Sequence, residues 1–140
     1  MTQPLRRIVW VALLAPWVAG CSSGPDVEMV PVRGTVKFAD GTVPQGETAT
    51  VIFEPVAGGS QQLRKLASGE IQPDGSFEMM TVKPGDGVIA GKYKVIFEVF
   101  KKDLGREPLV PQKYTKPETT PFEETVEPGM EPPEYVLEKP

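Results

Sequence analysis

The chain has no histidine, a single cysteine (Cys21) and only two tryptophans, both within its first 17 residues. Without histidine, Ser-His-Asp and Cys-His nucleophile systems and histidine-ligated zinc, iron or copper sites are excluded. A single cysteine also excludes a disulfide within the chain, so the fold depends on buried apolar surface for its stability. We therefore expect no catalytic residue, no metal and no cofactor.

Basic residues are outnumbered by acidic ones: the chain has 15 Lys and Arg against 19 Asp and Glu, a formal charge of −4. Removal of residues 1–20 takes away Arg6 and Arg7 but no acid, so 13 basic residues remain against 19 acidic ones and the charge becomes −6. Nucleic-acid binding and adhesion to anionic lipid both depend on clustered Lys and Arg that face phosphates. The charge balance argues against both kinds of partner.

Residues 1–20 have the pattern of a secretory signal peptide. Arg6 and Arg7 form a short positive region, and residues 8–19 form an apolar run without an acid. The run is shorter than the roughly 20 apolar residues of a membrane-spanning helix, and Pro16 interrupts its second half. We expect this segment to direct export and to be removed.

The apolar run ends in Val18-Ala19-Gly20-Cys21, which resembles the lipobox of bacterial lipoproteins. The resemblance implies cleavage after Gly20 and a thioether between the Cys21 thiol and diacylglycerol, with fatty acyl chains such as palmitate. One acyl chain binds a membrane reversibly, whereas two or more anchor a protein stably. The alternative is that Cys21 is a free thiol behind an ordinary signal peptide.

Residues 21–29 contain the small, polar stretch Ser22-Ser23-Gly24-Pro25-Asp26 and are expected to form the lipidated N-terminus and a flexible tether. The resemblance to lipoproteins also implies a location. Ser22 stands where some lipoproteins carry the aspartate that retains them in the inner membrane. We therefore expect an exported protein anchored in membrane lipid, on the outer membrane or cell surface rather than the inner membrane.

From residue 30 onwards apolar and polar residues alternate, which is the period of a half-buried strand. Strands are predicted at residues 32–38, 49–55, 76–82 and 91–100, and residues 61–71 are ambiguous. Turns are predicted at Asp40-Gly41 and Pro73-Asp74-Gly75, because aspartate caps a turn and glycine accepts a positive φ. The side chains predicted to face inward are those of Val32, Val36, Phe38, Val51, Phe53, Phe77, Met79, Tyr93, Val95, Phe97 and Val99.

The C-terminal part is rich in proline: eight of the 16 prolines lie at position 108 or beyond. Proline is confined to the edges and turns of sheets, so we expect short edge strands at residues 122–127 and 134–138, joined by irregular loops. Together these segments predict one all-β domain over residues 30–140. Its expected fold is a small antiparallel sandwich, immunoglobulin-like or prealbumin-like, with about seven strands.

The order and spacing of several motifs resemble carboxypeptidase regulatory-like, transthyretin-like sandwich domains, and in particular small lipoproteins of planctomycete bacteria. The resemblance covers about residues 30–138. It implies a fold and an envelope location, with an accessory, adhesive or ligand-presenting role rather than an activity. The motifs are Val32-Arg33-Gly34-Thr35-Val36, Val51-Ile52-Phe53-Glu54-Pro55, Asp74-Gly75-Ser76-Phe77, Gly91-Lys92-Tyr93-Lys94-Val95 and Pro111-Gln112-Lys113-Tyr114.

Two functions fit these patterns. In the first, which we favour, a lipid-anchored sandwich docks another envelope protein through a strand edge or an exposed patch. Ile96 and Phe100 fall on the polar face of their strand and are the candidates for that patch. In the second, loops at one end of the sandwich bind a small ligand or a carbohydrate, and Tyr114 and Tyr135 are the candidates because sugars stack on aromatic rings.

Acidic residues are the remaining candidates for chemistry. Asp74, Asp86 and Asp103 lie in predicted turns whose carbonyl oxygens could complete a calcium shell, but aspartate is also an ordinary turn residue. The pair Glu123-Glu124 is expected to be a solvated edge that discourages strand addition, rather than part of a glycosidase site. We favour the non-catalytic interpretation of all these residues.

Overall fold

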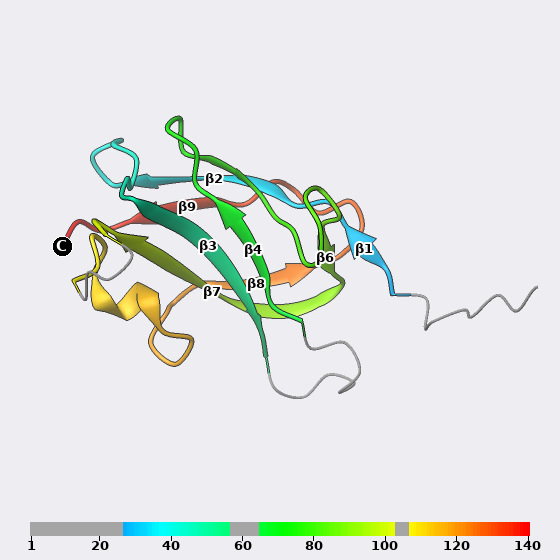
Figure 1. The fold of residues 1–140 in the computed structure, drawn as a ribbon. Coiled ribbons are helices and arrows are strands. Elements are labelled where there is room, and N and C mark those ends of the chain that lie inside the picture. The colour runs from blue at the N-terminus through cyan, green and yellow to red at the C-terminus, as the bar shows by residue number, and fades with distance from the viewer. Residues whose placement is uncertain (1–26, 57–64, 103–106) are drawn as a thin grey trace, which may run out of the picture.

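The computed structural model describes residues 27–56, 65–102 and 107–140. These residues form strands and one short 3-10 helix but no α-helix, so the predicted all-β class is confirmed (Figure 1). No helix among them is long and apolar enough to cross a membrane. The elements are β1 (Met29–Val30), β2 (Arg33–Phe38), β3 (Thr48–Pro55), β4 (Ala67–Glu70), β5 (Ser76–Glu78), β6 (Val88–Ile89), β7 (Gly91–Phe100), η2 (Gln112–Thr115), β8 (Glu123–Val126) and β9 (Glu134–Leu137).

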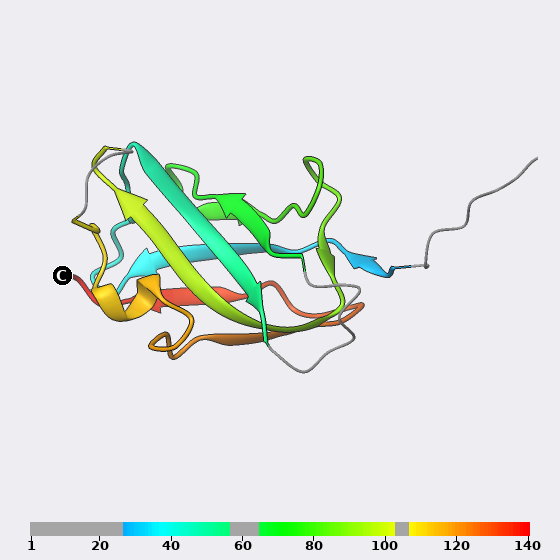
Figure 2. The same cartoon turned by 60° about the horizontal axis from the view of Figure 1, so that its bottom comes forward.

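Two sheets face each other and enclose one hydrophobic core, which agrees with the predicted sandwich (Figure 2). The first sheet has the strand order β4-β3-β7-β8, and the second has the order β5-β2-β9. The β1-β6 pair forms a separate short ribbon at one end of the molecule. Every residue predicted to face inward is buried, because alternate side chains of a strand point to the same face of its sheet.

One strand pairing is parallel, which corrects the expectation of an all-antiparallel sandwich. β9 runs parallel to β2, with Val36 opposite Tyr135. Both strands start near the β1-β6 ribbon: β2 follows β1 directly, and residues 127–133 turn the chain back after β8 (Figure 1). The two strands therefore point the same way when they meet.

The predicted turn at Pro73-Asp74-Gly75 is present and depends on its glycine. Gly75 has a φ of 85°, and a Cβ atom there would lie 2.6 Å from the carbonyl oxygen of Val36. Its N–H donates to the carbonyl of Gln72 at 2.8 Å. Glycine is the residue that accepts both the positive φ and the close approach to β2.

The proline-rich part supplies one edge strand to each sheet, as predicted. β8 is the edge of the four-stranded sheet, and β9 is the edge of the three-stranded sheet. The sequence did not predict β1, β6 or η2. β1 and β6 have two residues each, so they contain too few positions to show a period.

Different elements form the two ends of the sandwich (Figure 1). The β1 end comprises the β1-β6 ribbon, the loop of residues 80–87 and the turn of residues 127–133, and the described chain begins there. The η2 end comprises the turn of residues 39–47, the end of β7, η2 and the last residues of the chain.

Candidate interaction surfaces

The lipid-attachment residues predicted from the sequence lie outside the described residues. Val18, Ala19, Gly20 and Cys21 all precede Val27, where the description of the chain begins. Their predicted roles therefore stay predictions. The part that the structure does describe starts at the β1 end, two residues before β1.

The expectation that Ile96 and Phe100 form an exposed patch is wrong for Ile96. Ile96 is only 6% exposed, and Phe100 is half-buried. Ile96 lies opposite Ile52 of β3, in a strand that is also bonded on its other side by the segment around Thr120. In a strand with neighbours on both sides, adjacent side chains cover an apolar residue even on the polar face of the sheet.

Tyr114 and Tyr135 are also buried, at 3% and 4% exposure, so the expectation that they form an accessible sugar-stacking surface is wrong. Both rings belong to a cluster of aromatic residues that fills the space between the sheets. Tyr135 lies 5.5 Å from Phe97 and 5.4 Å from Phe122 between ring centroids, and Tyr114 stacks on Phe122 at 5.5 Å. Edge-to-face and offset geometries of this kind stabilise a core beyond simple burial.

The hydroxyl groups of these two tyrosines bond within the fold. The Tyr114 hydroxyl accepts a hydrogen bond from the Glu138 N–H at 3.3 Å, and the Tyr135 hydroxyl donates to Glu124 Oε2 at 2.9 Å. Burial, with the negative charge of Glu124 as a smaller cause, raises the pKa of Tyr135 above its ordinary value. The rings and hydroxyls thus fix the proline-rich segment to the sandwich.

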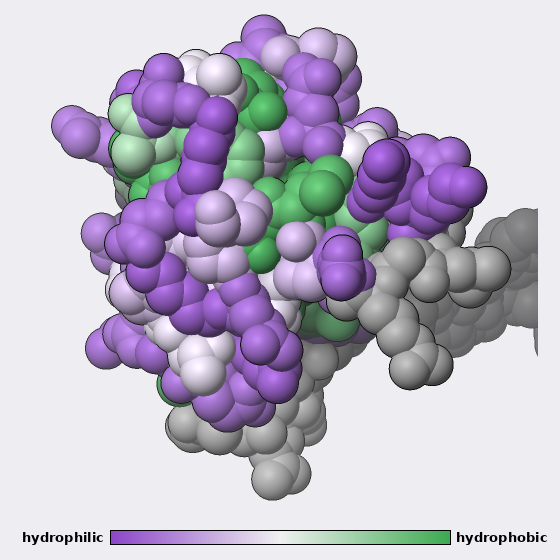
Figure 3. Space-filling model, turned by 90° about the vertical axis from the view of Figure 1, so that its left-hand side faces the viewer, coloured by the Kyte–Doolittle hydropathy of each residue, from purple (hydrophilic) through white to green (hydrophobic). Residues whose placement is uncertain are grey.

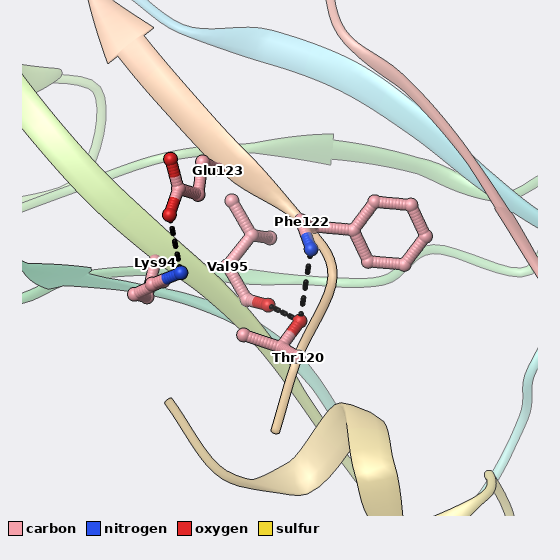
Figure 4. Close-up of polar contacts among 5 residues, drawn as sticks. All are labelled: Lys94, Val95, Thr120, Phe122 and Glu123. Carbon is pink, nitrogen blue, oxygen red and sulfur yellow. Dashed lines mark hydrogen bonds and ion pairs between the residues drawn. The ribbon is translucent and has the colours of Figure 1, made fainter. Parts of the chain in front are cut away.

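Thr120 joins the proline-rich segment to β7 (Figure 4). It is 5% exposed and, apart from the buried tyrosines, is the one buried polar side chain of the residues that the structure describes. Its hydroxyl donates to the Val95 carbonyl at 2.6 Å and accepts from the Phe122 N–H at 3.3 Å. The Val95 N–H in turn donates to the Phe122 carbonyl at 3.0 Å. These bonds extend the β7–β8 pairing to the residues that precede β8.

The adjacent acids Glu123 and Glu124 each have a partner in this segment. Glu123 pairs with Lys94 of β7, and the hydrogen bond from that ammonium lowers the pKa of the Glu123 carboxyl (Figure 4). Glu124 accepts the hydrogen bond from Tyr135. Both acids therefore attach β8 to neighbouring segments. This role is in addition to their predicted role, which is to place negative charge on the sheet edge.

The acidic turns use their carboxylates to hold their own backbones. Asp74 accepts hydrogen bonds from the Ser76 hydroxyl at 2.6 Å and the Ser76 N–H at 2.9 Å, and these bonds lower its pKa. Asp86 accepts three backbone N–H groups in the loop of residues 80–87, which also lowers its pKa. Within the described residues no three His, Cys, Asp or Glu side chains are grouped as metal ligands, and Asp103 lies outside those residues.

A groove of about 510 Å³ lies between the free edges of β4 and β5. Arg33 and Glu78 line it and form an ion pair at 2.8 Å, and Phe77 and Met80 contribute apolar surface. Reciprocal backbone hydrogen bonds between Ser68 and Met80 join the two sheets beside it. If the second predicted function is correct, this groove is a better ligand site than the buried tyrosines.

The η2 end has hydrophobic residues in its middle and hydrophilic residues around them (Figure 3). Val43 and Phe100 contribute half-buried side chains to this end, as does Leu109, whose N–H donates to the Val99 carbonyl near the end of β7. Ion pairs from Lys113 to Glu138, at 2.7 Å, and from Lys139 to Asp40 attach the end of the chain there. The Lys139 ammonium holds the pKa of Asp40 well below its ordinary value.

Sequence reasoning missed Thr120 and the loop held by Asp86. Thr120 precedes Pro121, which is an ordinary turn signal and does not indicate a buried hydroxyl. The sequence Lys83-Pro84-Gly85-Asp86-Gly87 did predict a break between strands, but it gave no sign of which backbone groups the aspartate would bind.

Comparison of the chain with models of protein families, with curated proteins and with solved structures found no match.

Proposed function

We propose that this chain is an exported lipoprotein whose β-sandwich serves as a non-catalytic structural or protein-docking module of the cell envelope. Acyl chains on Cys21 hold it in membrane lipid, on the outer membrane or cell surface, and its partner is another envelope protein. The observation that carries the proposal is the sequence Val18-Ala19-Gly20-Cys21, directly behind an apolar run of signal-peptide length.

The position of the sandwich supports this proposal. β1 starts at Met29, eight positions after Cys21, so a short tether separates the anchor from the fold. The described domain contains the segments that the sequence assigns to a sandwich, and its core is filled by side chains from both sheets. Binding therefore has to use surface features: sheet edges, the groove between β4 and β5, or the two ends.

The experiment has two parts, performed in cells that make the protein. Metabolic labelling with a clickable fatty acid tests lipidation of Cys21, with Cys21→Ala as the variant that lacks the thiol. Cross-linking in the intact envelope, followed by affinity capture and mass spectrometry, tests for a protein partner. We expect label and membrane association in the native chain, neither in the variant, and one cross-linked envelope protein that is lost with the anchor.

The outcomes separate the parts of the proposal. An unchanged membrane fraction for Cys21→Ala would contradict the lipid anchor. A lipidated chain that retains a glycan or small molecule instead of a protein would contradict docking and favour the ligand-binding alternative. In that case Arg33→Ala, in the groove between β4 and β5, should weaken retention, whereas Lys37→Ala, on the same strand but outside the groove, should not.

A further inference from the structure

The loop of residues 80–87, which we call the Asp86 loop, presents an apolar side chain on a fixed backbone. Val82 is 71% exposed, more than any other large hydrophobic residue of the described part. Asp86 Oδ1 accepts the Thr81 N–H at 2.8 Å, and Oδ2 accepts the N–H groups of Val82 and Lys83 at 2.9 and 3.0 Å. Because these bonds fix the loop, Val82 stays in water unless a partner covers it, and transfer of an apolar side chain from water to an apolar phase is favourable.

The Asp86 loop lies beside the place where the chain enters the fold. It leads directly into β6, which pairs with β1, with Val88 opposite Val30. Gly87 packs so closely on β1 that a Cβ atom there would lie 2.3 Å from the Val30 carbonyl oxygen. The loop and the beginning of the described chain therefore belong to the same end of the sandwich (Figure 1).

The length of the tether limits how far this end can lie from an anchor at Cys21. Six Cα-to-Cα steps separate Cys21 from Val27, which reach about 20 Å when fully extended. The sandwich is longer than this: β7 alone has 10 residues and spans about 30 Å. A lipidated Cys21 therefore keeps the β1 end near the bilayer, and the η2 end on the far side of the domain.

We propose that the Asp86 loop rests on the surface of the bilayer that holds the anchor, with Val82 at the boundary between headgroups and acyl chains and Lys83 among the headgroup phosphates. This inference rests on the lipidation of Cys21 in the function proposed above. Lys83 is exposed and forms no ion pair among the described residues, and a lysine next to an apolar side chain is typical of interfacial contacts. Glu28 and Glu131 are also exposed at this end, so the lipid surface is zwitterionic rather than strongly anionic.

Quenching of single fluorophores tests this contact. The full-length lipidated protein is placed in phosphatidylethanolamine and phosphatidylcholine vesicles that contain a lipid with a nitroxide on its headgroup. Because the thioether consumes the Cys21 thiol, Pro84→Cys in the Asp86 loop and Glu47→Cys at the η2 end each provide the sole free thiol for a fluorophore. We expect the reporter at position 84 to be quenched about threefold or more relative to the reporter at position 47, because collisional quenching needs contact with the headgroup layer.

Two valine substitutions separate a specific contact from mere proximity. Val82→Ser should reduce quenching at position 84 by about threefold or more, since it removes the apolar side chain from the interface. Val136→Ser changes the next most exposed valine of the described residues, 45% exposed on β9, and should leave the quenching unchanged. Circular dichroism of both variants checks that the fold is intact.

The outcomes distinguish failure of the membrane contact from failure of the lipid anchor. Equal quenching at positions 84 and 47, or equal effects of Val82→Ser and Val136→Ser, would overturn the contact while leaving the lipid anchor intact. An intact mass without lipid, together with failure of the chain to float with the vesicles, would overturn the proposed function and the contact with it.

Discussion

Thr120 offers the sharpest test of how the proline-rich segment is attached to the sandwich. Replacement by valine keeps the shape of the side chain but removes the hydroxyl that donates to the Val95 carbonyl at 2.6 Å. Thr120 is 5% exposed, so little water can replace the lost donor. A buried carbonyl without a partner costs about 1–3 kcal/mol, and we expect Thr120→Val to lower the free energy of unfolding by that amount.

Equilibrium urea unfolding, followed by far-ultraviolet circular dichroism, measures this change. With a urea dependence of about 1–3 kcal/mol per molar, the midpoint should fall by about 1 M. Thr120→Ser is the matched control: it keeps the hydroxyl and loses one methyl group, worth about 0.8 kcal/mol. If Thr120→Val is as stable as the native chain, the hydroxyl contributes nothing measurable, and the segment is held by its aromatic residues and its other hydrogen bonds and ion pair.

Three further predictions concern the packing of the core, the close contacts of Gly34, and the dependence of stability on pH. Phe97→Ala should lower the free energy of unfolding by about 3–5 kcal/mol in the same urea experiment, because Phe97 is fully buried in the aromatic cluster, whereas exposed Leu66→Ala should change it by less than about 0.5 kcal/mol. Gly34→Ala should cost about 1–3 kcal/mol, since its Cβ would lie 2.5 Å from both the Phe77 ring and the Pro133 carbonyl oxygen; a stability equal to that of the native chain would show that both groups move away freely. The pKa of Asp86 is lowered by the Thr81 N–H and its neighbours, so its contribution to stability is present above the ordinary value of 3.8 and is lost as the pH falls through the lowered value. The melting-temperature difference between the native chain and Asp86→Asn should therefore shrink from about pH 6 to about pH 2, and a constant difference would contradict the charge-assisted role of the carboxylate.

The strands other than β1, β4 and β6 could be predicted because alternate residues of each face the core. In residues 91–100 the alternation of apolar and charged residues gave the correct strand and the correct buried face, since period two is a direct consequence of strand geometry. The prolines likewise placed β8 and β9 at sheet edges, because a residue without an N–H cannot bond on both sides. Both features depend on local sequence, so they can be predicted from one amino-acid sequence without knowledge of tertiary contacts.

The buried candidates could not be recognised because their burial depends on residues far away in the sequence. Tyr114 is covered through its contacts with Phe97 and Phe122, and Tyr135 through contacts with residues of both sheets. Ile96 alternates with the polar set of its strand, yet its cross-strand neighbour is Ile52. The local pattern assigns a face to each residue but not the segment that later packs against that face.

The aromatic cluster restricts where a partner can bind to this protein. Because Phe97, Phe122 and Tyr135 fill the space between the sheets, a partner has to bind to the outer surface: the sheet edges, the groove between β4 and β5, or the two ends. The ends are not equivalent if the anchor is at Cys21. The β1 end, with its exposed Val82, then lies toward the lipid, and the η2 end, with hydrophobic residues in its middle, lies toward the rest of the envelope (Figure 3).

Cross-links from Lys101 or Lys102, which follow β7 at the η2 end, should therefore reach a protein partner in the intact envelope more often than cross-links from Lys83. The opposite preference would contradict this orientation.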